Sequence, residues 1–123
     1  MAQEDSIAKL QAQIKVFSEE RDWDQFHTPK NLILAATSEM GELAEVLQWK
    51  SDDEVIEYLS SQSGKDRISE EIADVAIYLI RLCQKINIDF IEAIQSKISI
   101  NDSKYPAEKS RGKSKKYNEL DES

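Results

Sequence analysis

Apolar residues along this chain recur at spacings of three and four, and they do not alternate with polar ones over the length of a strand. The first such stretch covers residues 6–20 and carries Ile7, Leu10, Ile14 and Phe17. One face of an amphipathic helix has this period, whereas a half-buried strand has a period of two. With only three glycines and two prolines in the chain, the pattern predicts an all-α fold.

Local start and stop signals divide the chain into predicted helices. Thr28 before Pro29 predicts a helix start, with threonine as the cap and proline at the first position, where its missing N–H costs nothing. Asn87 predicts a left-handed stop, and Asp89 with Glu92 has the spacing of a capping box. The predicted helices cover residues 6–20, 29–49, 52–61, 66–86 and 89–104, with a loop at 61–66.

The predicted domain organisation is simple. Residues 1–106 form one helical domain that Pro106 closes, and residues 107–123 form a basic, flexible tail. The segment "KSRGKSKK", 109–116, holds five of the sixteen basic residues. Two interpretations of it stay open: a solvated tail, or a tail that folds over an anionic ligand.

Two features predict close packing. Gly41 lies inside a predicted helix, where glycine costs about 1 kcal/mol relative to alanine, so we expect a neighbouring backbone to approach it. In "ADVAIYLIRLC", 73–83, apolar residues surround most of the helix, which favours burial on several sides and hence a homo-oligomer. The alternative is a central helix in a monomeric bundle.

Charge and composition argue against several classes of protein. A net charge of −8 disfavours nucleic-acid binding, because phosphate neutralisation needs a basic face. The N-terminus has no export signal, and no apolar run is long enough to span a bilayer, so we expect a cytoplasmic protein without a membrane partner. The one cysteine, Cys83, cannot form an internal disulfide and is expected to be a small buried apolar residue.

Two pairs of acids interrupt the apolar pattern. Glu39 and Glu42 are three residues apart on one predicted helix, and Glu71 and Asp74 repeat the spacing on the next long one. Residues three apart share a helix face, with Cβ atoms about 5–6 Å from each other. Like charges so close destabilise a helix, most of all when they are partly desolvated. Because apolar residues border both pairs, the pattern predicts a cation between the carboxylates or raised pKa values.

The predicted cation is a hard one. Oxygen-only sites suit Mg²⁺, with Mn²⁺ as a second possibility. A di-iron carboxylate bundle needs Glu-x-x-His from two helices, and the single histidine, His27, lies outside both pairs and is expected to be structural. The alternative is that the four acids lie on solvated helix faces, as most helical glutamates do.

The acid pattern resembles a known family. Glu39-x-x-Glu42 followed by Glu71-x-x-Asp74 is similar to the acidic signature of the MazG-like, all-α nucleoside triphosphate pyrophosphohydrolases. The resemblance to the dCTP pyrophosphatase branch extends over about residues 10–120. The blocks that carry it are "FSEERDWDQFHTPKNL", "GELAEVLQWK", "EEIADVAIYLI", "SKISIN", "KYP" and "KKYNEL".

This resemblance implies a fold and an activity. The implied fold is a four-helix core bundle with a short extra helix, assembled as a homotetramer (a dimer of dimers) with active sites at subunit interfaces. The implied reaction converts a (deoxy)nucleoside triphosphate, dCTP or a modified dCTP first, to the monophosphate and pyrophosphate. The implied ligands of Mg²⁺ are Glu39, Glu42, Glu71 and Asp74.

The resemblance also implies substrate contacts. A flat aromatic ring suits a nucleobase, while lysine can reach phosphate and asparagine can bond sugar or base. For Trp49 a packing role is the alternative, and for Lys97 and Asn101 an ordinary polar helix face. The implied substrate-binding residues are Trp23, Trp49, Lys97, Asn101, Lys104 and Tyr105.

Two positions depart from the family pattern. Lys104 stands where the motif usually has arginine, which keeps the charge but loses bidentate phosphate recognition. Ile14 stands where vertebrate relatives have a polar, base-contacting residue. The same chemistry on dATP or another noncytosine nucleotide is therefore an alternative.

In the implied reaction, Glu39 or Glu42 orients or deprotonates the attacking water. Lys97 and Lys104 stabilise the leaving pyrophosphate. Two interpretations from other classes stay open: a catalytically silent helical oligomer that binds nucleotide, and an adaptor whose acidic face recruits basic partners.

Overall fold

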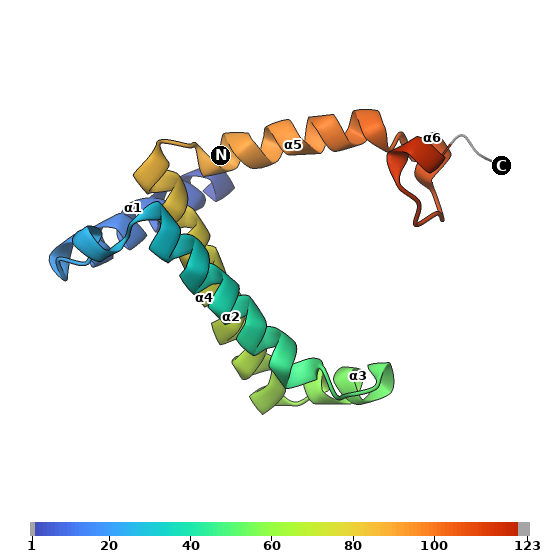
Figure 1. The fold of residues 1–123 in the computed structure, drawn as a ribbon, viewed down its shortest axis with the longest axis horizontal. Coiled ribbons are helices and arrows are strands. Elements are labelled where there is room, and N and C mark those ends of the chain that lie inside the picture. The colour runs from blue at the N-terminus through green and yellow to red at the C-terminus, as the bar shows by residue number, and fades with distance from the viewer. Residues whose placement is uncertain (1, 121–123) are drawn as a thin grey trace. The chain divides into compact units, whose positions relative to one another are not determined.

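Every regular element in the described part of this chain is helical. The computed structural model describes residues 2–120, with side chains for residues 6–120. Its elements are α1 (Ala2–Glu20), the 3-10 turn η1 (Asp24–Phe26), α2 (Pro29–Leu47), α3 (Asp52–Ser60), α4 (Gln62–Ile86), α5 (Phe90–Lys104), α6 (Ala107–Ser110) and η2 (Tyr117–Glu119) (Figure 1). Residues 2–120 contain no strand, so the all-α prediction is confirmed. None of the helices in this range is both long and apolar enough to cross a membrane.

The chain divides into two compact units, Met1–Asn87 and Ile88–Ser123. The first contains α1 to α4 and η1, and the second contains α5, α6 and η2. The boundary predicted at residue 106, the four-helix core bundle and the flexibility of the tail stay predictions. Within that tail, α6 and η2 are short ordered turns, and residues 121–123 lie outside the described part of the chain.

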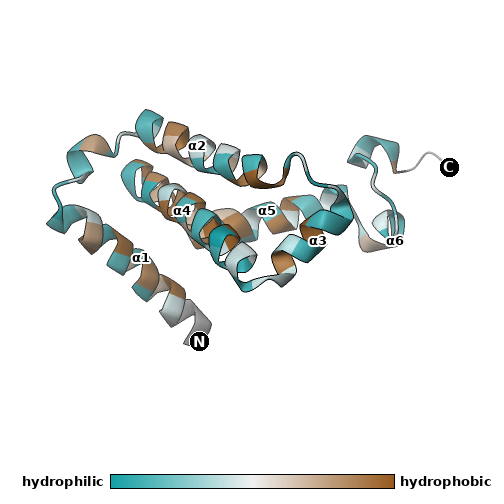
Figure 2. Cartoon of the chain, turned by 90° about the horizontal axis from the view of Figure 1, so that it is seen from below, coloured by the Kyte–Doolittle hydropathy of each residue, from teal (hydrophilic) through white to brown (hydrophobic). Residues whose placement is uncertain are grey.

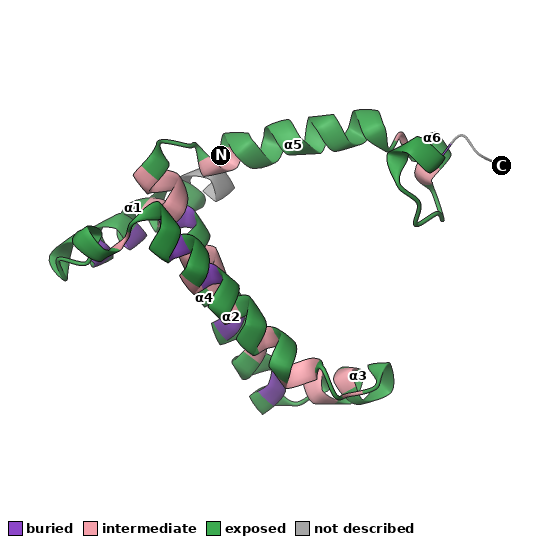
Figure 3. Cartoon of the chain, viewed as in Figure 1, coloured by how far each residue is buried: buried purple, intermediate pink, exposed green. Residues whose placement is uncertain are grey.

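In the first unit, α4 runs back along α2 in the opposite direction (Figure 1). Apolar and polar residues alternate in bands along both helices (Figure 2), and both helices contain buried residues (Figure 3). Leu32 and Ala36 of α2 are buried, and so is Ile80 of α4, which also lines a groove between α1 and α4. A buried leucine or isoleucine contributes about 1.5–3 kcal/mol relative to an exposed one, so these residues stabilise the first unit.

Three helix ends were predicted from capping residues close to them in sequence. The Thr28 hydroxyl accepts a hydrogen bond from the Asn31 N–H at 3.2 Å, with Pro29 in the first helical position. Asn87 closes α4 in the left-handed conformation, at φ 59° and ψ 42°. The Asp89 carboxylate accepts from the Glu92 N–H at 2.8 Å and caps α5. These three helix ends are confirmed, although at Asp89 only the first of the two bonds of a capping box is formed, and α2 ends at Leu47 and not at Trp49.

The predicted loop at 61–66 is wrong, because α4 already begins at Gln62. Ser61 ends α3 and caps α4, and its hydroxyl accepts a hydrogen bond from the Gly64 N–H at 3.1 Å. A Cβ at Gly64 would collide with the backbone oxygen of Tyr58. The serine and glycine that suggest a loop therefore make a one-residue joint, in which glycine lets the last turn of α3 touch the first turn of α4.

The close approach predicted at Gly41 is not found within the described chain. Apart from its chain neighbours and the backbone of its own helix, no atom of the described residues lies within 4 Å of the position that a Cβ would take there. The first unit thus gives no packing reason for this glycine.

The apolar residues that surround α4 are only partly buried by other helices of the same chain. Ile72, Ile77 and Leu79 are exposed, and Cys83 is half-buried. The predicted homo-oligomer, which would cover such residues, stays a prediction.

Candidate active site

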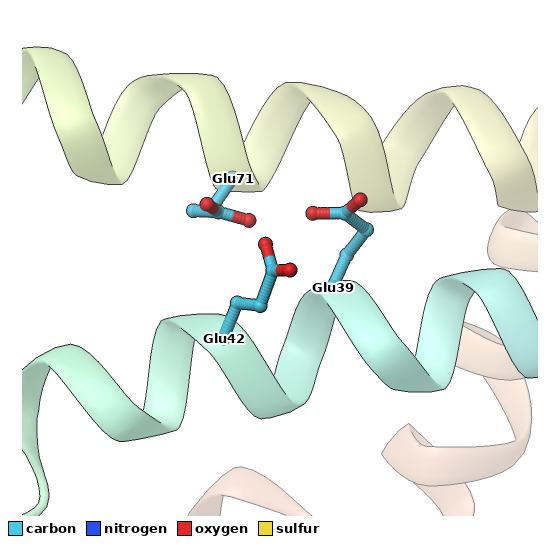
Figure 4. Close-up of side chains that lie close together, drawn as sticks. All are labelled: Glu39, Glu42 and Glu71. Atoms are coloured by element: carbon cyan, nitrogen blue, oxygen red, sulfur yellow. The ribbon is translucent and has the colours of Figure 1, made fainter.

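Three carboxylates meet between α2 and α4. Glu39 lies one turn after the buried Ala36, so the helical period places it, and Glu42 after it, on the side of α2 that faces α4. Glu71 comes from the opposing side of α4. One oxygen of each of the three carboxylates lies within 4.8 Å of the others, and all three groups point into the space between the helices (Figure 4).

Without a bound cation, the three carboxylates of the cluster repel one another. The pKa of Glu39 is raised from 4.5 to about 7, first by a hydrogen bond with Glu71, then by partial burial and by the negative charges of Glu42, Glu71 and Asp74. Glu71 is only 7% exposed. Its Oε1 accepts a long hydrogen bond from Arg67 Nε, at 3.4 Å, while its buried Oε2 has no hydrogen-bond partner in the described structure.

This donor set fits a divalent cation. A buried carboxylate oxygen without a partner costs free energy, and so do like charges held together, and a cation would relieve both. The ligands offered are all carboxylate oxygens, which suit hard ions. Asp74 is near enough for its charge to raise the pKa of Glu39, but its oxygens are not among those that lie within 4.8 Å of one another.

A groove of about 630 Å³ lies between α1 and α4. The residues that line it include Ile14, Phe17, Trp23, His27, Asp74 and Tyr78. Asp74 therefore lies on the groove wall and also acts on the acid cluster. Burial raises the pKa of the Tyr78 hydroxyl, and the charges of Glu39 and Asp74 add to the shift. Charges of the acid cluster therefore act on residues that line the groove, and both lie within the first compact unit.

Only one of the two tryptophans lines the groove. Trp23 is 44% exposed, and its ring meets Phe17 edge-on with the centroids 5.7 Å apart. The backbone N–H of Trp23 donates to the Ser18 carbonyl at 3.0 Å, which ties this residue to the end of α1. Trp49, just beyond the end of α2, is 88% exposed and is not among the groove residues.

The other predicted substrate residues belong to the second unit. Lys97, Asn101 and Lys104 lie on α5, and Tyr105 is its C-cap. Lys104 Nζ is 4.9 Å from the centroid of the Tyr117 ring, which Tyr105 also meets edge-on. Their part in a site stays a prediction that rests on the family motif.

A buried arginine was missed by the sequence analysis. Arg81 donates from Nη2 to Asp24 Oδ1 at 2.6 Å, from Nε to His27 Nδ1 at 3.1 Å and from Nη1 to Gln84 Oε1 at 2.8 Å. Lys85 Nζ reaches Asp24 Oδ2 at 3.0 Å, and Lys85 and Arg81 together hold the pKa of Asp24 below its usual value. The available signal was a lone arginine in an otherwise apolar stretch.

The raised pKa of Glu39 predicts how the stability of the metal-free protein depends on pH. Its folded-state value, about 7, lies above the ordinary 4.5, so the folded state binds this proton more tightly than the unfolded chain does. The contribution of Glu39 to the free energy of unfolding should therefore fall as pH rises from 4.5 to about 7. Glu39→Gln, which resembles the protonated acid, should flatten this dependence.

Thermal unfolding in the presence of a chelator, from about pH 5 to about pH 8, measures the effect. Glu57→Gln, which changes an exposed acid on α3, is the matched control. A Glu39→Gln profile parallel to that of the wild type would contradict the prediction.

Comparison with known proteins adds a family relationship. Residues 34–120 match the MazG-like family. Human and mouse proteins named dCTP pyrophosphatase 1 are 44% and 42% identical over 116 residues, which is 94% of this chain and 66% of each relative. The chain thus spans 66% of the length of these relatives. The crystal structure of a pyrophosphatase from Archaeoglobus fulgidus superposes with a TM-score of 0.74 at 41% identity, covering 82% of this chain and 93% of that one.

Proposed function

The chain belongs to the MazG-like family, and from this premise we propose that it is a Mg²⁺-dependent nucleoside triphosphate pyrophosphohydrolase. Its proposed substrate is dCTP or a modified dCTP, and the products are the monophosphate and pyrophosphate. The observation that carries the proposal is the cluster of Glu39, Glu42 and Glu71 next to the groove that contains Trp23. The names of the human and mouse relatives support this choice of substrate.

The acids have the first role in the proposed reaction. Glu39, Glu42 and Glu71, with Asp74 at the groove wall, would hold Mg²⁺ or Mn²⁺. Such an ion, when bound, neutralises phosphate charge and lowers the pKa of bound water. Glu39 or Glu42 orients the attacking water or accepts its proton. Arg67 donates to Glu71 Oε1 and so holds one oxygen of that carboxylate, while the buried Oε2 has no hydrogen-bond partner in the described structure.

The groove has the second role. The Trp23 ring offers a flat face on which a base can stack, next to the mostly apolar wall formed by α1 and α4. Asp74 lies on the same wall, so a base in the groove leaves the phosphates near the acids. Trp49, Lys97, Asn101, Lys104 and Tyr105 enter the proposal through the family motif, as contacts to base, sugar and phosphate.

One observation supports the alternative preference for dATP or another noncytosine nucleotide. Ile14 is buried and forms part of the groove wall. An isoleucine cannot accept or donate a hydrogen bond, so at this position it cannot read the polar edge of a base. The choice between cytosine and another base is then left to the remaining groove residues.

The proposed assembly is a homotetramer, a dimer of dimers. Large apolar side chains are exposed on several helices of this chain, among them Leu34 and Met40 on α2, Ile72 on α4 and Ile98 on α5. Contacts between copies would remove these side chains from water.

A panel of deoxynucleoside triphosphates tests the proposed function. With Mg²⁺ present, dCTP or a modified dCTP should have the highest kcat/KM, and anion-exchange chromatography should resolve monophosphate and pyrophosphate as the only products. Formation of a nucleoside diphosphate with orthophosphate would contradict the proposed bond cleavage. Preference for dATP would select the alternative substrate, and binding without turnover would select the catalytically silent nucleotide-binding oligomer.

A further inference from the structure

The most deeply buried charged side chain of the described structure lies in the groove wall, outside the acid cluster. Arg81 is 2% exposed, although arginine is almost never buried without partners. An unpaired guanidinium in such a place would cost several kcal/mol. The contacts that compensate it therefore indicate what the arginine does.

Two of its three partners belong to the segment that follows Trp23. Arg81 bonds Asp24 at 2.6 Å and His27 at 3.1 Å, across 57 and 54 residues of sequence. Both bonds leave α4 and end on η1 and its C-cap. Because two separate donors of one planar group are used, the η1 turn is held in orientation as well as in position.

The η1 turn begins directly after Trp23 and is bonded to it. The backbone carbonyl of Trp23 accepts hydrogen bonds from the Phe26 N–H at 2.8 Å and the His27 N–H at 3.1 Å. The Trp23 ring also packs beside the His27 ring, with the centroids 6.3 Å apart. A bond from Arg81 to His27 therefore acts on a ring that touches Trp23.

The same arginine is linked to the opposite wall of the groove. Its third donor bonds Gln84 Oε1 at 2.8 Å, and Gln84 Nε2 donates in turn to the Gln11 carbonyl of α1, also at 2.8 Å. One turn of α4 thus holds both α1 and the segment that carries Trp23. The width of the groove and the placement of its aromatic ring depend on one network.

We propose that Arg81 is a positioning residue that holds Trp23 against the groove and thereby sets the affinity for the nucleobase. The proposal rests on the proposed function, in which the Trp23 ring stacks on the base. Asp24 and His27 transmit the constraint, while Arg81 itself is a wall residue that need not touch the reacting phosphates.

The kinetic test separates positioning of the base from phosphate chemistry. Arg81→Met keeps most of the side-chain length and removes all three donors. It should raise KM for the preferred nucleotide about tenfold, because the loss of one well-placed stacking contact weakens binding by about that factor. The value of kcat should change less than about twofold. Inhibition by inorganic triphosphate, which has no base, should be unchanged. Lys65→Met, which removes an exposed cation from the same helix, is the matched control and should leave both constants unchanged.

A double-mutant cycle asks whether Arg81 acts through Trp23. In a Trp23→Ala background, Arg81→Met should cause no further rise in KM, because the ring that it positions is gone. Additive effects of the two substitutions, or a fall in kcat with KM unchanged, would overturn the proposal. Arg81→Lys keeps a positive charge near Asp24 but loses the planar guanidinium that bonds several partners at once, so it should give an intermediate KM. If Arg81→Met does not fold, Arg81→Lys replaces it in the same cycle.

Tryptophan fluorescence tests the positioning without any turnover. The chain has two tryptophans, so Trp49→Phe leaves Trp23 as the only tryptophan that emits. In that background Arg81→Met should increase quenching of Trp23 by acrylamide, and Arg81→Lys should increase it less. Unchanged quenching would overturn the proposal even if the enzyme is active. Absence of nucleotide hydrolysis by the wild type would instead refute the proposed function, and the quenching data would still decide whether Arg81 positions Trp23.

Discussion

Glu42→Gln is expected to lower kcat about 10³-fold, because a carboxylate of the proposed metal site supplies several kcal/mol of stabilisation that an amide cannot replace. Glu42 contributes one of the three clustered oxygens from the α2 side. The substitution preserves the size and shape of the side chain, but it removes the negative charge and replaces one acceptor oxygen by an NH2 donor. Steady-state hydrolysis of the preferred nucleotide at saturating Mg²⁺ measures the effect.

The fold should survive this change, since Glu42 is exposed and surface substitutions usually change stability by less than about 0.5 kcal/mol. Circular dichroism checks that the helices remain. Glu57→Gln removes the same charge from an exposed position on α3 and should keep wild-type turnover. Asp74→Asn should also lower kcat, because Asp74 lies beside the cluster on the groove wall. Near-wild-type turnover in Glu42→Gln or Asp74→Asn, with the helices intact, would remove the metal-site proposal.

Removal of divalent cations is expected to reduce nucleotide hydrolysis to the uncatalysed background, and added Mg²⁺ should restore it. The same cation should stabilise the fold, because it binds the folded cluster and not the unfolded chain. At a free concentration one hundred times its Kd, the gain in the free energy of unfolding is about 2.7 kcal/mol. Thermal unfolding in a chelator and in excess Mg²⁺ measures this gain independently of activity.

Glu71→Gln provides the sharpest variant for this second prediction. It replaces the carboxylate whose buried Oε2 lacks a hydrogen-bond partner, so it should abolish most of the stabilisation by Mg²⁺. Sodium chloride at matched ionic strength controls for general screening of the acids. Equal stabilisation by sodium chloride and by Mg²⁺, or full turnover in the chelator, would refute a divalent site at these acids.

Helix ends illustrate what a sequence shows well. Thr28 with Pro29, Asn87, and Asp89 with Glu92 were recognised because a cap depends on atoms only a few residues away. The joint at Ser61 was misread for a related reason. Serine and glycine serve loops and caps alike, and only the contact of Gly64 with the Tyr58 carbonyl region distinguishes them.

The acid pairs show an intermediate case. The three-residue spacing alone places Glu39 and Glu42 on one face of α2. Local spacing does not say that α4 lies opposite with Glu71 turned inward, nor that Asp74 remains outside the group of three clustered oxygens. The depth of burial that leaves Glu71 Oε2 without a partner likewise depends on how the two helices pack.

By itself, the sequence determined the helices, most of their ends and the faces on which the acids lie, because each depends on neighbours within one or two turns. Only the tertiary structure decided that Arg81 is buried and that it holds the segment of Trp23. Its partners Asp24 and His27 lie 57 and 54 residues away, and no periodicity in the chain encodes a contact at that distance. The cost of burying a charge is met by groups that folding brings together, so the role of such a residue emerges only when its surroundings exist.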